Sequence, residues 1–179
     1  MKRYCFIGSS RESLDIANAV QRQLSHHFDS TVWSQGVFKL NRSGVESLLA
    51  RIRQDDFAVF VLANDDLATM RGKKVKIVRD NVLFELGLFA GSIGFERTFF
   101  LVPANIEDFH IPSDLTGITT VTYDPTSHNG NRDAQVGGAC GQIVDAATNG
   151  GALSGIWDIF IKDRNSGDVR KTNRQANSS

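Results

Sequence analysis

The feature that most constrains the fold is an uninterrupted apolar run, FAVFVLA at residues 57–63. A strand with one solvated face alternates apolar and polar residues, whereas a run without alternation is typical of a parallel strand covered on both faces. Shorter apolar runs occur at residues 4–7, 31–33, 98–102 and 118–123. The last of these is rich in threonine, which suits the edge of a sheet. Together the runs predict a sheet of five strands.

Segments with a helical period separate the predicted strands. Apolar side chains recur every three or four residues over 14–28 and 45–52, and further helices are predicted around residues 82–93 and 135–147. We interpret residues 64–78 as a long loop. Strands that alternate with helices indicate an α/β domain with a parallel sheet and right-handed crossovers. The predicted fold is flavodoxin-like, with strand order 2-1-3-4-5, helices on both faces and any ligand at the carboxyl ends of the strands.

The domain organisation follows from length and polarity. A chain of 179 residues suffices for one core of ordinary size, and we expect one domain over residues 1–150. Residues 151–179 are predicted to be a C-terminal extension, either a linker or a disordered tail, because residues 162–179 are polar and lack an apolar period. The stretch WDIF at residues 157–160 is compatible with an added edge strand or with a fragment of a further element.

Charge and cysteine content limit the classes of function. Twenty Lys and Arg residues balance twenty Asp and Glu, so nothing favours nucleic acid or an anionic membrane as a partner. Cys5 and Cys140 lie far apart in sequence and indicate neither a disulfide framework nor a metal site. The apolar run near the N-terminus is too short for a signal peptide, so a cytoplasmic protein is expected.

One carboxylate interrupts an otherwise apolar helix in RDNVLFELGLFAG, residues 79–91. On a helical wheel, four residues lie opposite Glu85: Leu83, Gly87, Ala90 and Gly94. Because three of them are small, we expect that side to lie close to the sheet. Glu85 is then expected to point away from the sheet, flanked by Asn81, Val82, Phe89 and Ser92. Glu85 is then either a solvent-exposed glutamate of a surface helix or a catalytic carboxylate whose pKa is raised by its apolar neighbours.

The segment after the first strand, GSSR at residues 8–11, offers a second candidate site. Ser9, Ser10 and Arg11 lie where backbone N–H groups at a helix N-terminus bind anions, although the serines are equally suited to a simple helix cap. Neither GxGxxG nor GxxxxGK[ST] occurs in the chain, so no dinucleotide fingerprint or Walker loop is predicted.

Three further residues are candidates with structural alternatives. Trp33 ends the second strand and can stack on a base or a nicotinamide ring, or pack in the core. Arg79 can pair with Asp80, itself a predicted N-cap, or reach a phosphate. Asp114 is most simply another cap. The four histidines show no spacing typical of a catalytic triad or a metal site.

Five segments resemble a known family: CFIGSS, TVWSQGVF, ESLLARIRQDDFAVFVLANDD, RDNVLFELGLFAGSIGFERTFFLVP and IPSDLTGITTVTYD. They are similar to bacterial TIR-like domains that act as effectors of cyclic-nucleotide-activated antiphage systems, including TIR–STING fusions. The resemblance covers residues 4–124. It implies a flavodoxin-like TIR fold and an NAD glycohydrolase that releases nicotinamide and ADP-ribose, or a cyclic variant. NAD is then the substrate, and no cofactor or metal is implied.

The resemblance also implies roles for individual residues and for partners. Glu85 corresponds to the catalytic glutamate, and the implied substrate-binding residues are Ser9, Ser10, Arg11, Trp33, Arg79 and Asp114. The loop that follows Trp33 corresponds to a segment that often completes the site of a neighbouring subunit. A homo-oligomer or filament formed through TIR–TIR contacts is therefore expected, activated through a cyclic-nucleotide-sensing partner or a further domain.

Two alternatives remain beside the NAD glycohydrolase. The first is a module without catalysis, either a TIR adaptor or a nucleotide-binding sensor, because no catalytic residue besides Glu85 is assured. The second is an enzyme similar to nucleoside deoxyribosyltransferases, which would share the fold class and a glutamate acting on a glycosidic bond.

Overall fold

A parallel five-stranded sheet forms the centre of the protein. The computed structural model describes residues 2–37, 43–63, 66–70, 73–104 and 120–149. The strands of the sheet, in spatial order, are β2 (Phe28–Val32), β1 (Arg3–Ser9), β3 (Phe57–Val61), β6 (Thr98–Pro103) and β7 (Thr120–Tyr123). Every neighbouring pair in this sheet is parallel. The predicted order 2-1-3-4-5 is confirmed, and the threonine-rich strand lies at an edge.

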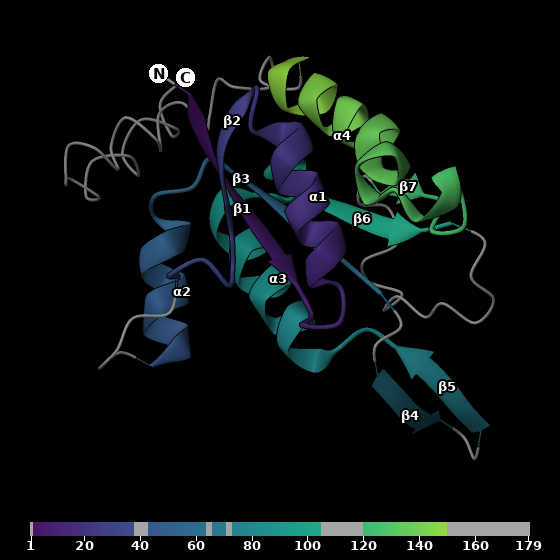
Figure 1. Cartoon of the computed structure of the whole chain (residues 1–179). Helices are drawn as coiled ribbons and strands as arrows, with labels where there is room; N and C mark the ends of the chain where they lie inside the picture. Colours follow the sequence, from purple (N-terminus) through teal and green to yellow (C-terminus); the bar gives the residue numbers. More distant parts are fainter. Residues whose placement is uncertain (1, 38–42, 64–65, 71–72, 105–119, 150–179) are drawn as a thin grey trace, which may run out of the picture.

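Helices cover both faces of the sheet (Figure 1). On one face, α1 (Leu14–Leu24) lies beside α4 (Arg132–Asn149), and on the other α2 (Gly44–Ile52) lies beside α3 (Asp80–Ile93). Short 3₁₀ segments, η1 (Phe95–Arg97) and η3 (His128–Gly130), precede β6 and α4. No helix in the described part of the chain is long and apolar enough to span a bilayer.

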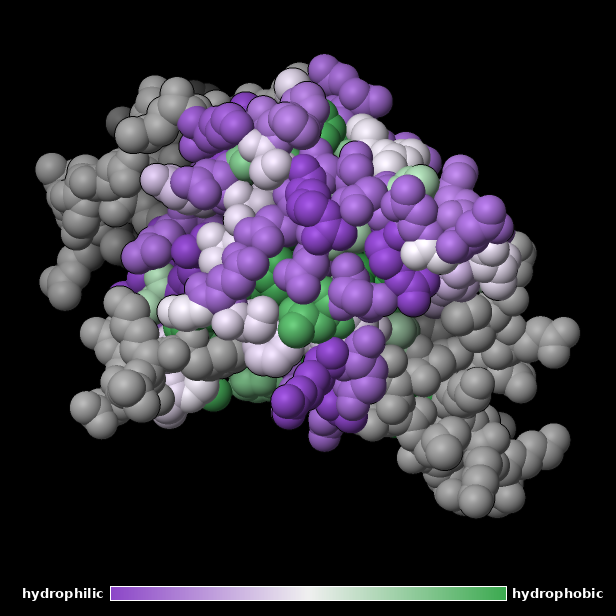
Figure 2. Space-filling model, in the orientation of Figure 1, coloured by the Kyte–Doolittle hydropathy of each residue, from purple (hydrophilic) through white to green (hydrophobic). Residues whose placement is uncertain are grey.

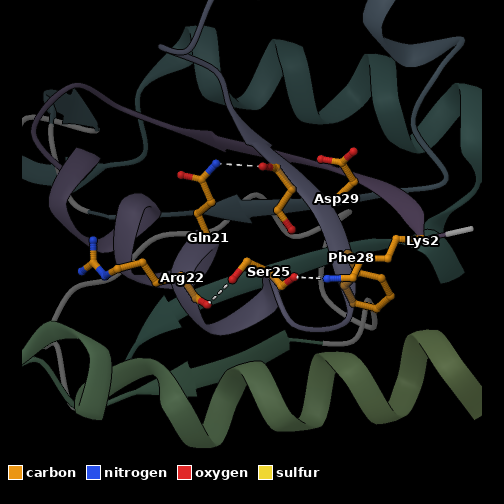
Figure 3. A pocket seen from close by; sticks show the side chains of 7 residues that line it. Lys2, Gln21, Arg22, Ser25, Phe28 and Asp29 are labelled. Carbon is orange, nitrogen blue, oxygen red and sulfur yellow. Dashed lines mark hydrogen bonds between the residues drawn. The ribbon is translucent and has the colours of Figure 1, made fainter.

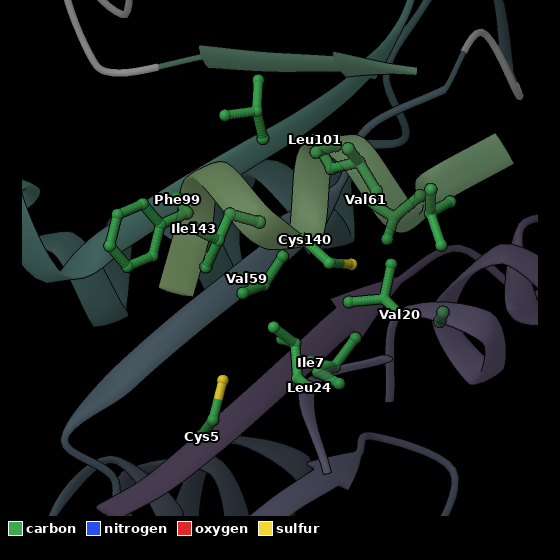
Figure 4. Packing of buried hydrophobic residues seen from close by; sticks show 14 of the residues in the cluster. Cys5, Ile7, Val20, Leu24, Val59, Val61, Phe99, Leu101, Cys140 and Ile143 are labelled. Atoms are coloured by element: carbon green, nitrogen blue, oxygen red, sulfur yellow. The ribbon is translucent and has the colours of Figure 1, made fainter. Parts of the chain in front are cut away.

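Two hydrophobic cores result, because successive residues of a strand point to opposite faces. Ile7, Val59 and Leu101 face α1 and α4, where Cys140 and Ile143 pack among them (Figure 4). The alternate strand residues, Phe6, Phe60 and Phe100, pack against α2 and α3. Hydrophilic side chains cover most of the outer surface of α1 and α4, so these helices bury one side only (Figure 2).

The structure corrects two predicted segments. Residues 64–78 were expected to be a loop, but β4 (Asp66–Met70) and β5 (Lys73–Ile77) pair there as an antiparallel hairpin, with Ala68 opposite Val75. The three lysines of β5 conceal it, because lysine is depleted in strands. Helix α1 ends at Leu24 rather than Phe28, because Phe28 opens β2 and pairs with Arg3.

Several expectations fall on residues that the structure does not describe. These are Asp114, the predicted edge strand at residues 157–160, and the extension 151–179. The last described element is α4, which contains the predicted helix 135–147 and extends beyond it at both ends.

Candidate functional site

The helix that carries Glu85 packs on the sheet through large apolar side chains. Its buried residues are Val82, Leu86, Phe89, Ala90 and Ile93. Phe89 stacks on Phe6 at 4.6 Å between ring centroids and meets the ring of Phe60 edge-on at 5.6 Å. The helix ends at Ile93, and the C-cap residue Gly94 has a φ of +94°, which L side chains rarely adopt.

This packing corrects the predicted orientation of the helix. Gly87 was expected to face the sheet, but it is exposed and a Cβ added there would meet no atom within 4 Å. Leu86 and Phe89 turn toward the sheet instead, because each buries far more apolar surface than a glycine can. Glu85 therefore lies beside the buried face of the helix, next to Val82 and Phe89, rather than directly opposite that face.

Glu85 is half-buried in a pocket of about 260 Å³ between α2 and α3. The pocket is lined by Gly44, Val45, Leu48, Asn81, Phe84 and Glu85. Burial raises the pKa of the Glu85 carboxyl to about 7. This is the direction expected from the apolar residues on either side of it in the sequence. A carboxylate held this way favours a ligand that brings positive charge or hydrogen-bond donors.

The segment after β1 is tied to the segment after β2. Trp33 Nε1–H donates to Ser9 Oγ at 2.9 Å, and Ser9 Oγ in turn donates to the carbonyl of Ser10 at 2.8 Å. Ser10 Oγ accepts from the backbone N–H of Ser13 at 3.1 Å in the turn before α1. The alternative that Ser9 or Ser10 caps the helix is wrong, because the N-cap of α1 is Ser13. Both serines are buried, and half-buried Trp33 packs against both cores. These hydroxyls therefore act within the fold, and Trp33 joins two loops at the carboxyl ends of their strands.

Arg79 connects the segment after β1 to the start of α3. Its guanidinium lies 3.0 Å from the Glu12 carboxylate, and it donates a second hydrogen bond to Glu12 at 3.2 Å. The prediction that Asp80 caps α3 is wrong. Arg79 itself occupies the N-cap position, while Asp80 Oδ1 accepts from the N–H of Asn81. Arg11, which directly precedes Glu12 in the sequence, is exposed.

The predicted site residues form two groups. One group joins Ser9, Ser10 and Trp33, and Arg79 reaches the neighbouring Glu12. Glu85 lies apart from them, six residues after Arg79, which is about 9 Å along the axis of α3. Ser9, Ser10, Trp33 and Arg79 are not among the described residues that line the Glu85 pocket. Gly44, the first residue of α2, does line it.

Sequence reasoning missed three residues of this pocket: Val45, Leu48 and Phe84. Asn81 precedes Glu85 by four residues, so its place on the same side of the helix follows from the helical period. Val45 and Leu48 come from another helix, and nothing local in the sequence indicates which face of α3 they meet.

A larger pocket, of about 360 Å³, lies at the other end of the sheet (Figure 3). Its lining includes Lys2 and Phe28, which stand at the starts of their strands, and Arg22 and Ser25 from the end of α1. Lys2 Nζ donates to the carbonyl of Ser25, and Arg22 pairs with Asp133. Because parallel α/β sheets bind ligands at the carboxyl ends of strands, the pocket of Glu85 is the better candidate. Among the described residues no group of three or more His, Cys, Asp or Glu is placed to hold a metal ion.

The fold and this site together define a class. A parallel sheet of order 2-1-3-4-5 with helices on both faces is a flavodoxin-like α/β fold, the fold of TIR domains. The sequence profile described as CAP12/Pycsar effector protein, TIR domain, matches residues 4–125. The chain belongs to this family of bacterial TIR domains.

Curated relatives agree with the profile. The chain is 40% identical over 141 residues to the Pycsar effector protein PaPycTIR of Pseudomonas aeruginosa, a match that covers 78% of this chain and 46% of that protein. It is 39% identical over 126 residues to CD-NTase-associated protein 12 of Flavobacterium daejeonense, covering 70% of this chain and 40% of the relative. The Pycsar effector protein BcPycTIR of Burkholderia cepacia is 40% identical over 119 residues, covering 66% and 39%. The chain thus spans less than half the length of these relatives.

Proposed function

We propose that this domain is an NAD glycohydrolase and that Glu85 promotes cleavage of the bond between nicotinamide and ribose. The observation that carries the proposal is the position of Glu85, half-buried in an apolar pocket on the helix that precedes β6. A glutamate that served only solubility would point into water, where its pKa would keep its ordinary value near 4.5.

The chemistry needs one well-placed carboxylate. Nicotinamide leaves as a neutral base with the electron pair of its bond to the anomeric carbon, and positive charge develops on the ribose as in glycoside hydrolysis. The ionised Glu85 carboxylate stabilises that charge and accepts hydrogen bonds from the ribose hydroxyls. Water then attacks the anomeric carbon and loses a proton, which gives ADP-ribose. Attack by a group of the same nucleotide would give a cyclic product.

The surroundings of Glu85 strengthen this effect. Apolar side chains of Val45, Leu48 and Phe84 line the pocket with Glu85, whose carboxyl is partly removed from water. Charges interact more strongly where the local dielectric constant is low. The apolar lining therefore supports a role in which Glu85 acts on developing positive charge.

The biological setting of the proposal comes from the relatives. They are named Pycsar effectors and CD-NTase-associated proteins, so we place the domain in an antiphage system that responds to a cyclic nucleotide. The sensing element would be a partner or the portion of the relatives that this chain does not match. Activity is expected to rise on self-association through TIR–TIR contacts, with a rate per molecule that increases with protein concentration.

The test is incubation with NAD and chromatography of the products, with and without a panel of cyclic nucleotides. Glu85→Gln keeps the size of the side chain and removes the charge, and the proposal predicts that it abolishes nicotinamide release. Glu96→Gln, at an exposed position on η1, is the matched control and should release nicotinamide at the wild-type rate. Unchanged NAD consumption by Glu85→Gln would reject the assignment.

One observation favours a second function, a TIR adaptor without catalysis. The hydroxyls of Ser9 and Ser10 are engaged in hydrogen bonds within the protein, so they are not displayed for a substrate. An adaptor would leave NAD intact under every condition of the same assay, so the products distinguish the two functions.

A further inference from the structure

The ring of Phe60 lies directly against the backbone of Gly8. The two residues are neighbours in the register of β3 and β1. A Cβ added at Gly8 would stand 2.5 and 2.6 Å from two ring atoms of Phe60, a separation that real Cβ atoms essentially never show. The φ of Gly8 lies outside the left-handed region, so its backbone suits any residue. Glycine is therefore required here for space and not for conformation.

The Phe60 ring is held in place by two other rings. Its centroid lies 5.9 Å from that of Phe6 and 5.6 Å from that of Phe89, and Phe6 and Phe89 stack on each other at 4.6 Å. All three side chains are fully buried. We call Phe6, Phe60 and Phe89 the ring cluster. Because closely packed interiors transmit strain, an atom added at Gly8 would displace this cluster as a whole.

The ring cluster supports the helix that carries Glu85. Phe89 is the member of the cluster that belongs to α3, and Glu85 precedes it by four residues, so the two lie on the same side of the helix one turn apart. The depth to which Phe89 is buried therefore sets the position of the Glu85 carboxyl relative to the sheet.

We propose that Gly8 is a positioning residue, which acts on Glu85 through the ring cluster. The missing side chain at residue 8 leaves room for the Phe60 ring, and the cluster then seats α3 close to the sheet with the Glu85 carboxyl in its pocket. This inference rests on the proposed function, because it explains how the carboxylate that promotes cleavage is held. It assigns a role to a residue of β1 that makes no contact with the substrate.

The pKa of Glu85 reports how α3 is seated. Burial is the cause of its rise to about 7, and Glu85 is the only ionisable residue among the described residues that line the pocket. Movement of α3 away from the sheet admits water and lowers this pKa toward the ordinary value of 4.5. The experiment therefore follows the Glu85 carboxyl carbon by NMR titration of the full chain without NAD.

Gly8→Ala should lower the pKa of Glu85 by about 1 unit, because the added Cβ displaces the rings and α3 with them. The acid limb of the kcat/KM profile for NAD should move to lower pH by the same amount. A glycine that served packing alone would lower Tm when substituted and leave both quantities unchanged. A folded Gly8→Ala variant with the wild-type pKa at Glu85 would overturn the inference.

The matched control is Gly87→Ala. Gly87 lies on α3 two residues after Glu85, but it is exposed and a Cβ added there would meet no atom within 4 Å. This substitution should leave the pKa of Glu85 unchanged and raise Tm slightly, because alanine favours a helix more than glycine does. Equal pKa shifts in the two variants would show that the contact with Phe60 is not responsible, and the inference would be wrong.

A second set of variants carries the test if Gly8→Ala alone does not fold. Phe60→Leu removes the ring that obstructs a Cβ, so Gly8→Ala added to Phe60→Leu should fold and keep the pKa that Phe60→Leu has by itself. Gly8→Val in the same background refills the space and should lower the pKa of Glu85. Misfolding or a shifted pKa in the alanine double variant, or no shift in the valine one, would contradict the inference.

The failure of the inference is distinct from failure of the proposed function, because the titration needs no substrate. If the wild type releases nicotinamide from NAD but the pKa of Glu85 is indifferent to Gly8→Ala, the positioning role is wrong and the enzyme assignment stands. If the pKa shifts as expected but the wild type never cleaves NAD, the positioning role stands and catalysis is rejected.

Discussion

The guanidinium of Arg79 lies 3.0 Å from the carboxylate of Glu12 and fastens the segment after β1 to the start of α3. The two residues are 67 positions apart in sequence. The ion pair therefore joins the loop at the carboxyl end of the first strand to the helix that carries Glu85.

Breaking this pair should affect activity more than stability. Both partners are partly or fully exposed, and exposed ion pairs contribute about 0–1 kcal/mol. We expect Arg79→Ala to lower nicotinamide release at least severalfold, because the start of α3 is no longer held against the loop, while Tm changes by a few degrees at most. Steady-state rates and a thermal melt measure the two effects.

A second exposed pair provides the control. Arg22 lies 2.8 Å from Asp133 and links α1 to α4 on the other face of the sheet. Arg22→Ala should have a similarly small effect on Tm and none on the rate. Equal losses of rate in both variants would show that the Arg79 pair has no special connection to the site.

The raised pKa of Glu85 predicts how activity depends on pH. Burial raises this pKa to about 7, and the proposed mechanism requires the ionised form. The kcat/KM for NAD should therefore fall about tenfold per pH unit below 7 and level off above it, since this parameter reports the free enzyme. Initial rates between pH 5.5 and 8.5 measure the profile. A flat profile over this range would contradict the assigned ionisation.

The same pKa predicts a pH-dependent gain in stability for Glu85→Gln. In the unfolded chain the carboxyl loses its proton near the ordinary value of 4.5, whereas in the folded protein it keeps the proton up to about 7. The Glu85 carboxyl therefore lowers the free energy of unfolding progressively as pH rises from 4.5 to 7. Above pH 7 this loss is complete. Glu85→Gln should raise Tm relative to wild type at pH 8 and have little effect near pH 4.5.

This stability effect is also a control for the loss of activity. A variant that is inactive because it is unfolded cannot be more heat-resistant than the wild type at pH 8. A lower Tm for Glu85→Gln than for the wild type at pH 8 would show that the carboxylate serves packing, contrary to the account.

A buried ion pair near the start of β3 should govern the stability of the fold. Arg51 makes two hydrogen bonds to Asp55, at 2.7 and 2.8 Å, and the Asp55 side chain is inaccessible to solvent. Arg51→Ala leaves a buried carboxyl without its partner and should cost about 3–5 kcal/mol in free energy of unfolding. Chemical denaturation measures the loss, and Arg53→Ala, at an exposed position nearby, should change it by about 0.5 kcal/mol or less.

The pH dependence of this loss has a definite sign. Burial raises the pKa of Asp55 to about 6 even with Arg51 beside it, and removal of the guanidinium raises it further. The folded variant then holds a proton that the unfolded chain has lost, so destabilisation by Arg51→Ala should be larger at pH 8 than at pH 5. The opposite order would show that the pair does not act through the buried charge.

The parts of the fold that the sequence could predict are those with a local hydrophobic signal. The apolar residues of β3 fill both cores, so an unbroken run at 57–63 is enough to recognise a central strand. The hairpin of β4 and β5 lacks such a signal, because lysines occupy three of the five positions of β5. Its pairing depends on a partner strand that is itself short.

The site was predictable only in part for a related reason. The apolar neighbours of Glu85 indicated a raised pKa, since they lie on the same helix. The orientation of α3 was predicted wrongly. The small residues suggested that their side of the helix lies close to the sheet, but Leu86 and Phe89 occupy the face that packs on the sheet instead. The Glu12–Arg79 pair and the contribution of Val45 depend on tertiary contacts that no spacing in the sequence reveals.

The most direct test of the central claim is the rate of nicotinamide release by wild type and Glu85→Gln at pH 8, with the folded state of both verified by circular dichroism. The account predicts that the wild type converts NAD to nicotinamide and ADP-ribose or its cyclic variant, and that the folded variant is slower by about 100-fold or more, as expected when a transition-state charge loses its partner. Equal rates of release by the two proteins would contradict it.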